Sequence, residues 1–150
     1  MNHPWTAHYP AGIPAEINPD TFASIPALFD EVAKTHGNRT AFVCLRKGIS
    51  YKEVNALSTR FAGYLQSLGL EPGDRVAVMM PNLTQYMIAL LGILRARLIA
   101  VNVNPLYTAH ELAHQLKDSG AKAVVIIENF AKTLETALPE TEVKHIITTK

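Results

Sequence analysis

The chain has 150 residues, a length that suits one ordinary domain. Hydrophobic residues make up 48% of it and charged residues 18%, which is typical of a globular protein on the apolar side. The formal net charge of +1 gives no reason to expect nucleic acid or an acidic surface as a partner. The single cysteine, Cys44, excludes an internal disulfide framework and fits a reducing cytosol. We interpret it as a small buried hydrophobic residue.

The first residues contain neither the basic nor the apolar region of a secretory signal. The longest apolar run, Met87 to Leu94, is far shorter than the roughly 20 residues that a membrane-spanning helix needs. We therefore expect a soluble cytoplasmic protein, and we leave open a peripheral contact with the inner face of the cell membrane.

Residues 1–19 form a proline-rich arm that cannot be regular helix. We expect this arm to lie extended over the domain or over a partner, with Trp5 and Tyr9 as docking anchors. It is also the segment we expect to make an oligomer contact, such as that of a homodimer.

After the arm, Ser24 is expected to cap a helix that ends at Gly37. The residues on its apolar face are Ile25, Leu28, Phe29 and Val32. Two short strands follow at 41–45 and 49–51, and residues 46–48 are expected to form the turn of a hairpin between them.

Ser50 and Glu53 form a capping box that predicts a helix running to Leu68, with Gly69 as the left-handed residue just after it. The apolar stripe of this helix consists of Val54, Leu57, Phe61, Tyr64, Leu65 and Leu68. Residues 72–74, a Pro-Gly-Asp turn, then lead the chain into its central strand.

The central strand, residues 76–80, is continuously apolar, as expected of a strand buried on both faces of a parallel sheet. Asn82, with Gln85 three residues later, predicts the start of a helix over 83–96, and a second strand follows at 98–103. The helix is apolar nearly all round, which indicates that it is covered on more than one side. The unit is therefore strand–helix–strand, with a right-handed crossover.

Thr108 and Glu111 form a second capping box, and this helix ends before Gly120. The remaining expected elements are a strand at 123–127, a helix at 129–137 and a strand at 143–147. Alternating strands and helices predict an α/β fold with a mainly parallel sheet and helices on both faces. Because one such layer covers the apolar helix only once, we expect the chain to be the N-terminal piece of a longer enzyme.

The segment His110-Glu111-Leu112-Ala113-His114 matches the zincin pattern, in which two histidines bind zinc and the glutamate acts as a base. Leu112 and Leu116 define the buried face of the predicted helix, so both histidines should point to solvent. A zinc metallopeptidase stays an alternative that this geometry disfavours.

A phosphate site of the common kind needs a glycine-rich loop whose amides face the anion. The loop at 81–83 has no glycine, and Pro81 has no amide N–H to donate. Ser119 and Lys122 have Ser-x-x-Lys spacing, but a nucleophilic serine of that type begins a helix, whereas Ser119 should end one. We assign no catalytic residue, no cofactor-binding residue and no metal ligand within this chain.

The runs GDRVAVMMPN, LLGILRA and AVNVNPLYTAHELAHQLKDSGAKAVV resemble the N-terminal part of bacterial long-chain fatty-acid–CoA ligases, members of the adenylate-forming superfamily. The resemblance extends from about residue 9 to residue 150. It implies that residues 20–150 are the first portion of an AMP-binding domain, upstream of the family's catalytic motifs. Four segments look like early scaffold motifs of the family: Tyr51, residues 73–75, residues 81–82 and residues 104–105. Arg97 departs from the pattern, because the family usually has glycine there.

The resemblance implies a two-step activity for the whole enzyme: a fatty acid reacts with ATP to give acyl-AMP, and CoA then gives acyl-CoA. It further implies that Mg²⁺ serves the whole enzyme and that this fragment alone binds none of these cofactors and is inactive. Two alternatives stay open: an adenylate-forming ligase for another acid, such as an aryl acid, and a non-catalytic α/β interaction module.

Overall fold

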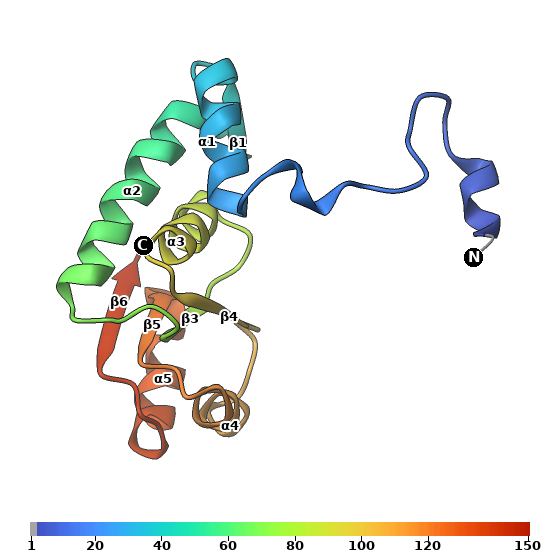
Figure 1. The fold of residues 1–150 in the computed structure, drawn as a ribbon. Coiled ribbons are helices and arrows are strands. Elements are labelled where there is room, and N and C mark those ends of the chain that lie inside the picture. The colour runs from blue at the N-terminus through green and yellow to red at the C-terminus, as the bar shows by residue number, and fades with distance from the viewer. Residues whose placement is uncertain (1–2) are drawn as a thin grey trace.

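The computed structural model describes residues 3–150 (Figure 1). Its helices are α1 (Ile25–His36), α2 (Tyr51–Ser67), α3 (Thr84–Arg95), α4 (Ala109–Ser119) and α5 (Ala131–Ala137). Its strands are β1 (Thr40–Cys44), β2 (Lys47–Ser50), β3 (Arg75–Met79), β4 (Ile99–Val103), β5 (Ala123–Ile127) and β6 (His145–Thr149). Short 3-10 turns are η1 (Pro4–His8), η2 (Pro19–Thr21), η3 (Glu128–Phe130) and η4 (Leu138–Glu140).

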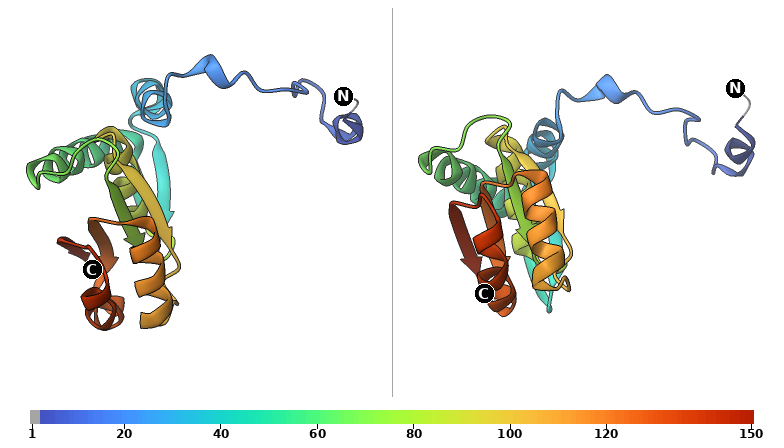
Figure 2. Two further views of the ribbon diagram at one scale, coloured as in Figure 1. Left: turned by 60° about the horizontal axis from the view of Figure 1, so that its bottom comes forward. Right: turned by 90° about the horizontal axis from the view of Figure 1, so that it is seen from below.

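The main sheet is parallel and has the strand order β4-β3-β5-β6, while β1 and β2 form a separate antiparallel hairpin. Helices α4 and α5 pack on one face of the sheet, and α3, backed by α2, covers the other (Figure 2). The predicted α/β class, with a parallel sheet and helices on both faces, is confirmed.

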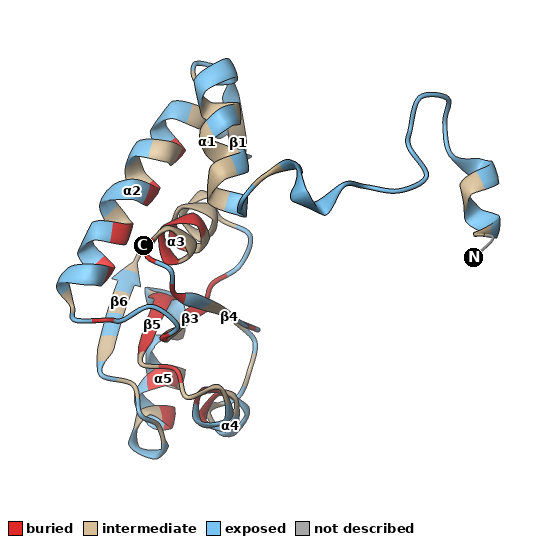
Figure 3. Cartoon of the chain, in the orientation of Figure 1, coloured by how far each residue is buried: buried red, intermediate tan, exposed pale blue. Residues whose placement is uncertain are grey.

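Strand β3 contributes to both hydrophobic cores, which explains its unbroken apolar sequence. Val76 and Val78 point to the α2/α3 side, whereas Ala77 and Met79 point to the α4/α5 side. Figure 3 shows the same division, with buried residues on the helix faces turned toward the sheet and exposed residues on the outer faces. A strand in this position has no face left for polar side chains.

Helix α3 lies between the sheet and α2, which accounts for its nearly uniform apolar surface. Ala89 and Ile93 belong to the core against the sheet, and Phe61 of α2 packs on the same core. Gly92 brings the two helices together: a methyl group there would lie 2.7 Å from the Phe61 ring and 3.1 Å from the Ser58 carbonyl oxygen. The expected cover on more than one side is supplied by α2 within this chain.

Replacing Gly92 with alanine is expected to lower the free energy of unfolding by about 1–2 kcal/mol. The overlap with Phe61 and the Ser58 carbonyl outweighs the gain in helix propensity, which is at most about 1 kcal/mol. The matched control is Gly63→Ala in α2, where a methyl group projects into open space, so that this variant should be more stable than the parent. Urea denaturation measures both, and a stabilised Gly92→Ala would mean that α2 and α3 are not in close contact.

The predicted N-caps at Ser24, Ser50 and Thr108 are confirmed. The Ser24 hydroxyl accepts from the amide of Ala27, and both capping boxes are complete. The hydroxyl and amide of Ser50 donate to Glu53 at 2.7 and 2.9 Å, and these bonds lower the pKa of Glu53 below its usual value. The amide and hydroxyl of Thr108 lower the pKa of Glu111 in the same way.

Several predicted boundaries were wrong. The hairpin turns at Leu45 and Arg46, not at 46–48, because Cys44 pairs directly with Lys47. Asn82 does not cap α3: Leu83 is the N-cap and has no side-chain bond, while the Asn82 carbonyl oxygen lies 3.9 Å from the Cys44 sulfur.

Two elements near the C-terminus also differ from the prediction. The last strand runs over His145–Thr149, not 143–147, because its pairing with β5 starts at Ala123 opposite His145. The helix expected at 129–137 begins as the 3-10 turn η3 and becomes α-helical only at Ala131. The residues just before β6 and just before α5 have apolar patterns similar to those of the elements themselves. The sequence alone therefore did not show where each element starts.

Exposure was also misjudged at three places, one of them Tyr64 of the expected apolar stripe of α2, which is 47% exposed. Every residue of α1 remains exposed or half-buried, and Ile25 and Leu28 of its expected apolar face are exposed. Cys44, expected to be buried, is half-buried.

The proline-rich arm is not regular helix, as predicted, but it does not lie over the domain. It forms η1 and η2 and projects away from the rest of the chain (Figure 1). Trp5 and Tyr9 are both exposed, and Trp5 stacks on His3 at a ring-centroid distance of 4.7 Å. Among residues 3–150, no helix combines the length and apolar character needed to cross a membrane.

Helix α3 ends with Arg97 in the left-handed conformation (φ 62°), where glycine is the preferred residue. The amide of Arg97 donates to Leu94, and the amide of Leu98 donates to Ile93, the two bonds of a Schellman motif. The Arg97 carbonyl also accepts from the amide of Gly73 at 2.9 Å. Arg97 therefore closes the helix in the left-handed conformation, and the backbone strain falls on one exposed arginine.

Arg97→Gly is expected to be neutral or to stabilise the protein by up to about 1 kcal/mol. Glycine removes the left-handed strain and keeps every backbone hydrogen bond, against the small loss of a positive charge at the helix C-terminus. Arg97→Val should destabilise it, because a β-branched residue fits the left-handed conformation poorly. Thermal unfolding of the three proteins tests the order, and a clear loss of stability in the glycine variant would contradict it.

Candidate functional site

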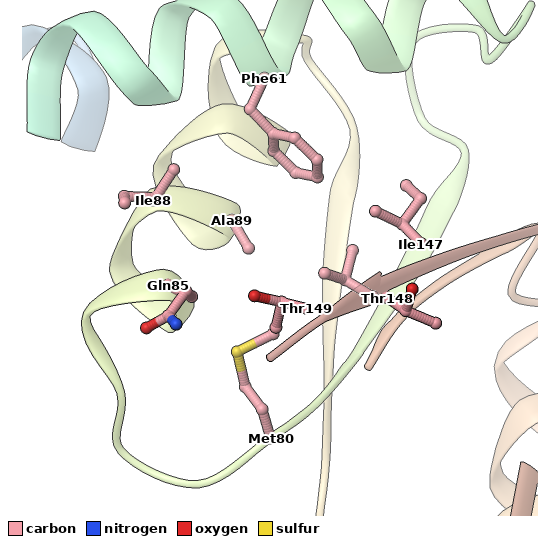
Figure 4. A pocket seen from close by; sticks show the side chains of 9 residues that line it. Phe61, Met80, Gln85, Ile88, Ala89, Ile147, Thr148 and Thr149 are labelled. Atoms are coloured by element: carbon pink, nitrogen blue, oxygen red, sulfur yellow. The ribbon is translucent and has the colours of Figure 1, made fainter. Parts of the chain in front are cut away.

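An apolar cavity lies between α3 and the C-terminal halves of β5 and β6 (Figure 4). Its volume is about 210 Å³. The nine residues that line it are Phe61, Met80, Gln85, Ile88, Ala89, Val125, Ile147, Thr148 and Thr149. Figure 4 shows the Met80 thioether and the Ile147 side chain directed into this space, with Phe61 above them.

The side chains that line this cavity suit an apolar ligand. Apart from two threonines and Gln85 its lining is apolar, and the Gln85 amide is engaged with the Lys150 carbonyl at 3.0 Å. Sites for drug-sized ligands usually reach about 300 Å³ or more. The cavity can hold a small apolar group, and its nine lining residues include no acid, base or cation to drive a reaction.

The loop after β3 lacks the glycines of a phosphate-binding loop. The amide of Leu83 already donates to the Pro81 carbonyl at 2.8 Å, and the amide of Tyr86 donates to Leu83 at 3.1 Å. Pro81 itself has no N–H. The prediction that this segment contains no catalytic or cofactor-binding residue stays a prediction.

The histidines of the His-Glu-x-x-His segment lie on the solvent face of α4. His110 and His114 are exposed, whereas Leu112 and Leu116 are buried, which confirms the predicted orientation. Glu111 is occupied in the capping box with Thr108. Within residues 3–150, no group of three or more His, Cys, Asp or Glu side chains could hold a metal ion together.

The two residues of the Ser-x-x-Lys pair make separate structural contacts. The Ser119 hydroxyl donates to the Leu116 carbonyl at 3.3 Å, at the end of α4 as predicted. The Lys122 ammonium lies 2.6 Å from the Asp74 carboxylate. Neither arrangement matches a nucleophile next to its base.

The Gly73-Asp74-Arg75 segment ties the start of β3 to the end of α4. Asp74, 7% exposed, accepts from the amide of Glu71 and pairs with Lys122. These contacts hold the pKa of Asp74 below its usual value, the bond to Lys122 having the larger effect. The Arg75 guanidinium donates to the carbonyls of Ser119 at 2.9 Å and Gly120 at 2.8 Å, which satisfies the C-terminal end of α4.

The other expected scaffold segments also have local roles. Tyr51 packs against Phe29 of α1 at a ring-centroid distance of 5.8 Å. The Asn104 side chain accepts from the amide of Leu106 at 3.0 Å, which turns the chain after β4.

Sequence reasoning missed a polar cluster around Arg95 that joins three helices. Its guanidinium donates to Asp30 of α1 and to Asn55 and Ser58 of α2. The Arg95 side chain is only 13% exposed. One signal was available: Arg95 directly follows the apolar run Met87 to Leu94, and a charged residue that is buried beside such a run requires polar partners.

The AMP-binding enzyme family model matches residues 29–150. A long-chain-fatty-acid–CoA ligase of Salmonella typhimurium is 52% identical over 151 aligned positions, covering 100% of this chain and 27% of the relative. The enzyme of that name from Bacillus subtilis is 36% identical and covers 83% of this chain and 22% of its own length. The chain thus spans about a quarter of the length of these relatives.

Solved structures show the same fold. A Mycobacterium tuberculosis fatty acyl CoA synthetase superposes with a TM-score of 0.77 at 29% identity, over 83% of this chain and 26% of that one. A benzoate CoA ligase of Burkholderia xenovorans gives a TM-score of 0.79 at 26% identity, over 83% and 25%. Acyl and aryl ligases therefore share this architecture, so the fold alone does not select the acid.

Proposed function

Since this chain belongs to the AMP-binding enzyme family, we propose that it is the N-terminal part of a long-chain fatty-acid–CoA ligase. The observation that carries the proposal is the 52% identity to a ligase of that name across the whole chain, arm included. The structural match to a benzoate CoA ligase reaches 26% and covers less of the chain. Residues 1–19 are the arm in this proposal, and residues 20–150 are the first portion of the AMP-binding domain.

The proposed reaction has two steps. The fatty-acid carboxylate attacks the α-phosphorus of ATP, which forms acyl-AMP and releases pyrophosphate, with Mg²⁺ neutralising the phosphate charge. The CoA thiolate then attacks the acyl carbon, the acyl–oxygen bond breaks, and AMP leaves. Adenylation replaces a poor leaving group with a good one, and both steps need donors and cations aimed at developing charge.

Residues 3–150 contribute the framework for this chemistry rather than its reacting groups. The parallel sheet and the α2/α3 pair pack into one layer, and the contacts of Asp74 and Arg75 join the start of β3 to the end of α4. In the proposal, the groups that touch ATP lie beyond Lys150.

Pyrophosphate exchange tests the proposal directly. The complete enzyme should exchange labelled pyrophosphate into ATP with palmitate and then form palmitoyl-CoA when CoA is added. Residues 1–150 alone should do neither and should bind no ATP. Exchange with benzoate only would favour the aryl-acid alternative, and a complete protein without any acid-dependent exchange would favour the interaction module.

We also propose that the enzyme works in the cytoplasm at the inner face of the cell membrane and forms a homodimer through its arm. The exposed Trp5 and Tyr9 on the projecting arm support the dimer. Removal of residues 1–19 should then convert the enzyme from dimer to monomer in light-scattering measurements, and an unchanged molar mass per particle would refute the arm contact.

A further inference from the structure

The turn of the β1–β2 hairpin combines two unfavourable features at one residue. Leu45 and Arg46 both have positive φ angles, 49° and 66°, in a two-residue turn that usually takes Asn-Gly. The Leu45 side chain is 87% exposed, and Val43, two residues earlier, is 68% exposed. Within the described part of the chain, no contact compensates for the strained backbone and the exposed apolar side chain at this turn.

Positive charge accompanies this apolar tip. Arg46 and Lys47 follow Leu45 directly, and both are exposed. A leucine flanked by basic residues suits the boundary between lipid headgroups and acyl chains, where the apolar group enters and the cations meet anionic headgroups. The charge pattern of the turn is thus complementary to an anionic bilayer.

The strands of the hairpin lie beside the loop that follows β3 and the start of α3. Phe42, Val43 and Cys44 line a cavity of about 290 Å³ together with Leu83 and Met87, beside the loop that follows β3. The Cys44 sulfur lies 3.9 Å from the Asn82 carbonyl oxygen. Figure 2 shows the hairpin running along the sheet and ending at a turn that projects beyond it.

We propose that the β1–β2 turn is a membrane-docking element, in which Leu45 and Val43 enter the interface of an anionic bilayer and Arg46 and Lys47 bind its headgroups. A two-residue turn offers far less than the roughly 1,000 Å² of a specific protein interface, whereas a lipid surface needs no matching shape. The inference rests on the proposed function, because the long-chain fatty acid of that proposal reaches the enzyme from a bilayer. Lipid binding can be measured without catalysis, so the two can be tested separately.

The experiment uses the complete enzyme and two kinds of vesicle: phosphatidylcholine containing phosphatidylglycerol, and pure phosphatidylcholine. Flotation should show binding to the anionic vesicles, and Leu45→Asn should weaken it about ten-fold by removing one apolar side chain from the interface. Asparagine tolerates the left-handed conformation, so the melting temperature of this variant should not fall. Arg46→Gln/Lys47→Gln should weaken binding to the anionic vesicles about ten-fold or more.

Ile25→Asn is the matched control, since Ile25 is 61% exposed and lies in α1, outside both the hairpin and the arm. It should bind vesicles as the parent does. Equal losses in Ile25→Asn and Leu45→Asn, or no loss in Leu45→Asn, overturn the proposal. The proposal is also overturned if the Leu45→Asn enzyme still binds vesicles but melts at a lower temperature, because Leu45 then packs against protein.

Palmitoyl-CoA formation from detergent-dispersed palmitate separates this inference from the proposed function. The hairpin variants should retain it, because the turn lies outside the reacting groups. Intact vesicle binding by an enzyme that makes no palmitoyl-CoA would refute the ligase assignment alone, while full activity with no vesicle binding in the parent would refute the docking element alone.

Discussion

Replacing Arg95 with alanine is expected to lower the free energy of unfolding by about 3 kcal/mol. The guanidinium donates to Asp30, Asn55 and Ser58, and the change leaves these groups of α1 and α2 without their shared partner. Removal of one member of a largely buried charged cluster costs about 3–5 kcal/mol. The lower end applies here because Asp30 is 44% exposed and can regain water. Urea denaturation measures the loss.

Two variants separate the Arg95 cluster from a general effect of losing an arginine. Arg95→Lys keeps the charge but not the planar fork, so it should recover only part of the lost stability. Arg60→Ala removes an exposed arginine from α2 and should change the free energy of unfolding by less than about 0.5 kcal/mol. Equal effects of Arg60→Ala and Arg95→Ala would show that the cluster adds nothing to the packing of the three helices.

Asp74→Asn is expected to lower the free energy of unfolding at neutral pH by about 2 kcal/mol, the value of a hydrogen bond to a charged group. The carboxylate lies 2.6 Å from the Lys122 ammonium and accepts from the amide of Glu71 at 2.9 Å. The amide side chain keeps at most the second of these bonds. Thermal unfolding at neutral pH gives the difference.

The same substitution should remove part of the acid sensitivity of the fold. Because the folded-state pKa of Asp74 is lowered, its contribution is present above the unfolded value, about 3.9, and is lost as the pH falls through the folded value. The stability difference between parent and Asp74→Asn should therefore shrink below about pH 4. Glu53 and Glu111, whose pKa values are also lowered, keep some acid sensitivity in both proteins.

The control for Asp74 is Glu128→Gln, which removes a longer ion pair, 3.9 Å, between two exposed side chains, Glu128 and Lys150. Exposed pairs of this kind contribute about 0–1 kcal/mol. A gap between parent and Asp74→Asn that stays constant down to the acid transition would mean that Lys122 does not stabilise the ionised form of Asp74.

Local signals in the sequence predicted the elements whose ends depend on their own residues. Both capping boxes, the Ser24 cap and the left-handed Gly69 and Gly120 occur where they were expected. A cap depends on hydrogen bonds between residues three apart, so the sequence contains all of its partners. The buried strand β3 and the solvent-facing histidines of α4 were predictable for a similar reason, since periodicity reports which face is apolar.

Elements whose limits depend on distant partners were predicted less well. The start of β6 is determined by its register with β5, and the hairpin turn by the pairing of Cys44 with Lys47. At Asn82 a good capping residue is not used, and its carbonyl instead faces Cys44 of the hairpin. These element ends depend on which strand or loop lies next to them in the fold. A single sequence does not show which segments are neighbours in space.

The sequence by itself determined the α/β class, the order of the elements, most helix ends and the resemblance that pointed to the family, because these rest on local hydrogen bonding, apolar periodicity and motif wording. Only the tertiary structure decided that Arg95 joins α1, α2 and α3, that Arg75 closes the end of α4, and that Leu45 stands strained and exposed at the hairpin turn. Each of these depends on residues far apart in the chain, or on a backbone conformation that pairing imposes. The physical reason is that burial, charge pairing and strain are properties of neighbours in space, which sequence patterns report only when those neighbours are also close along the chain.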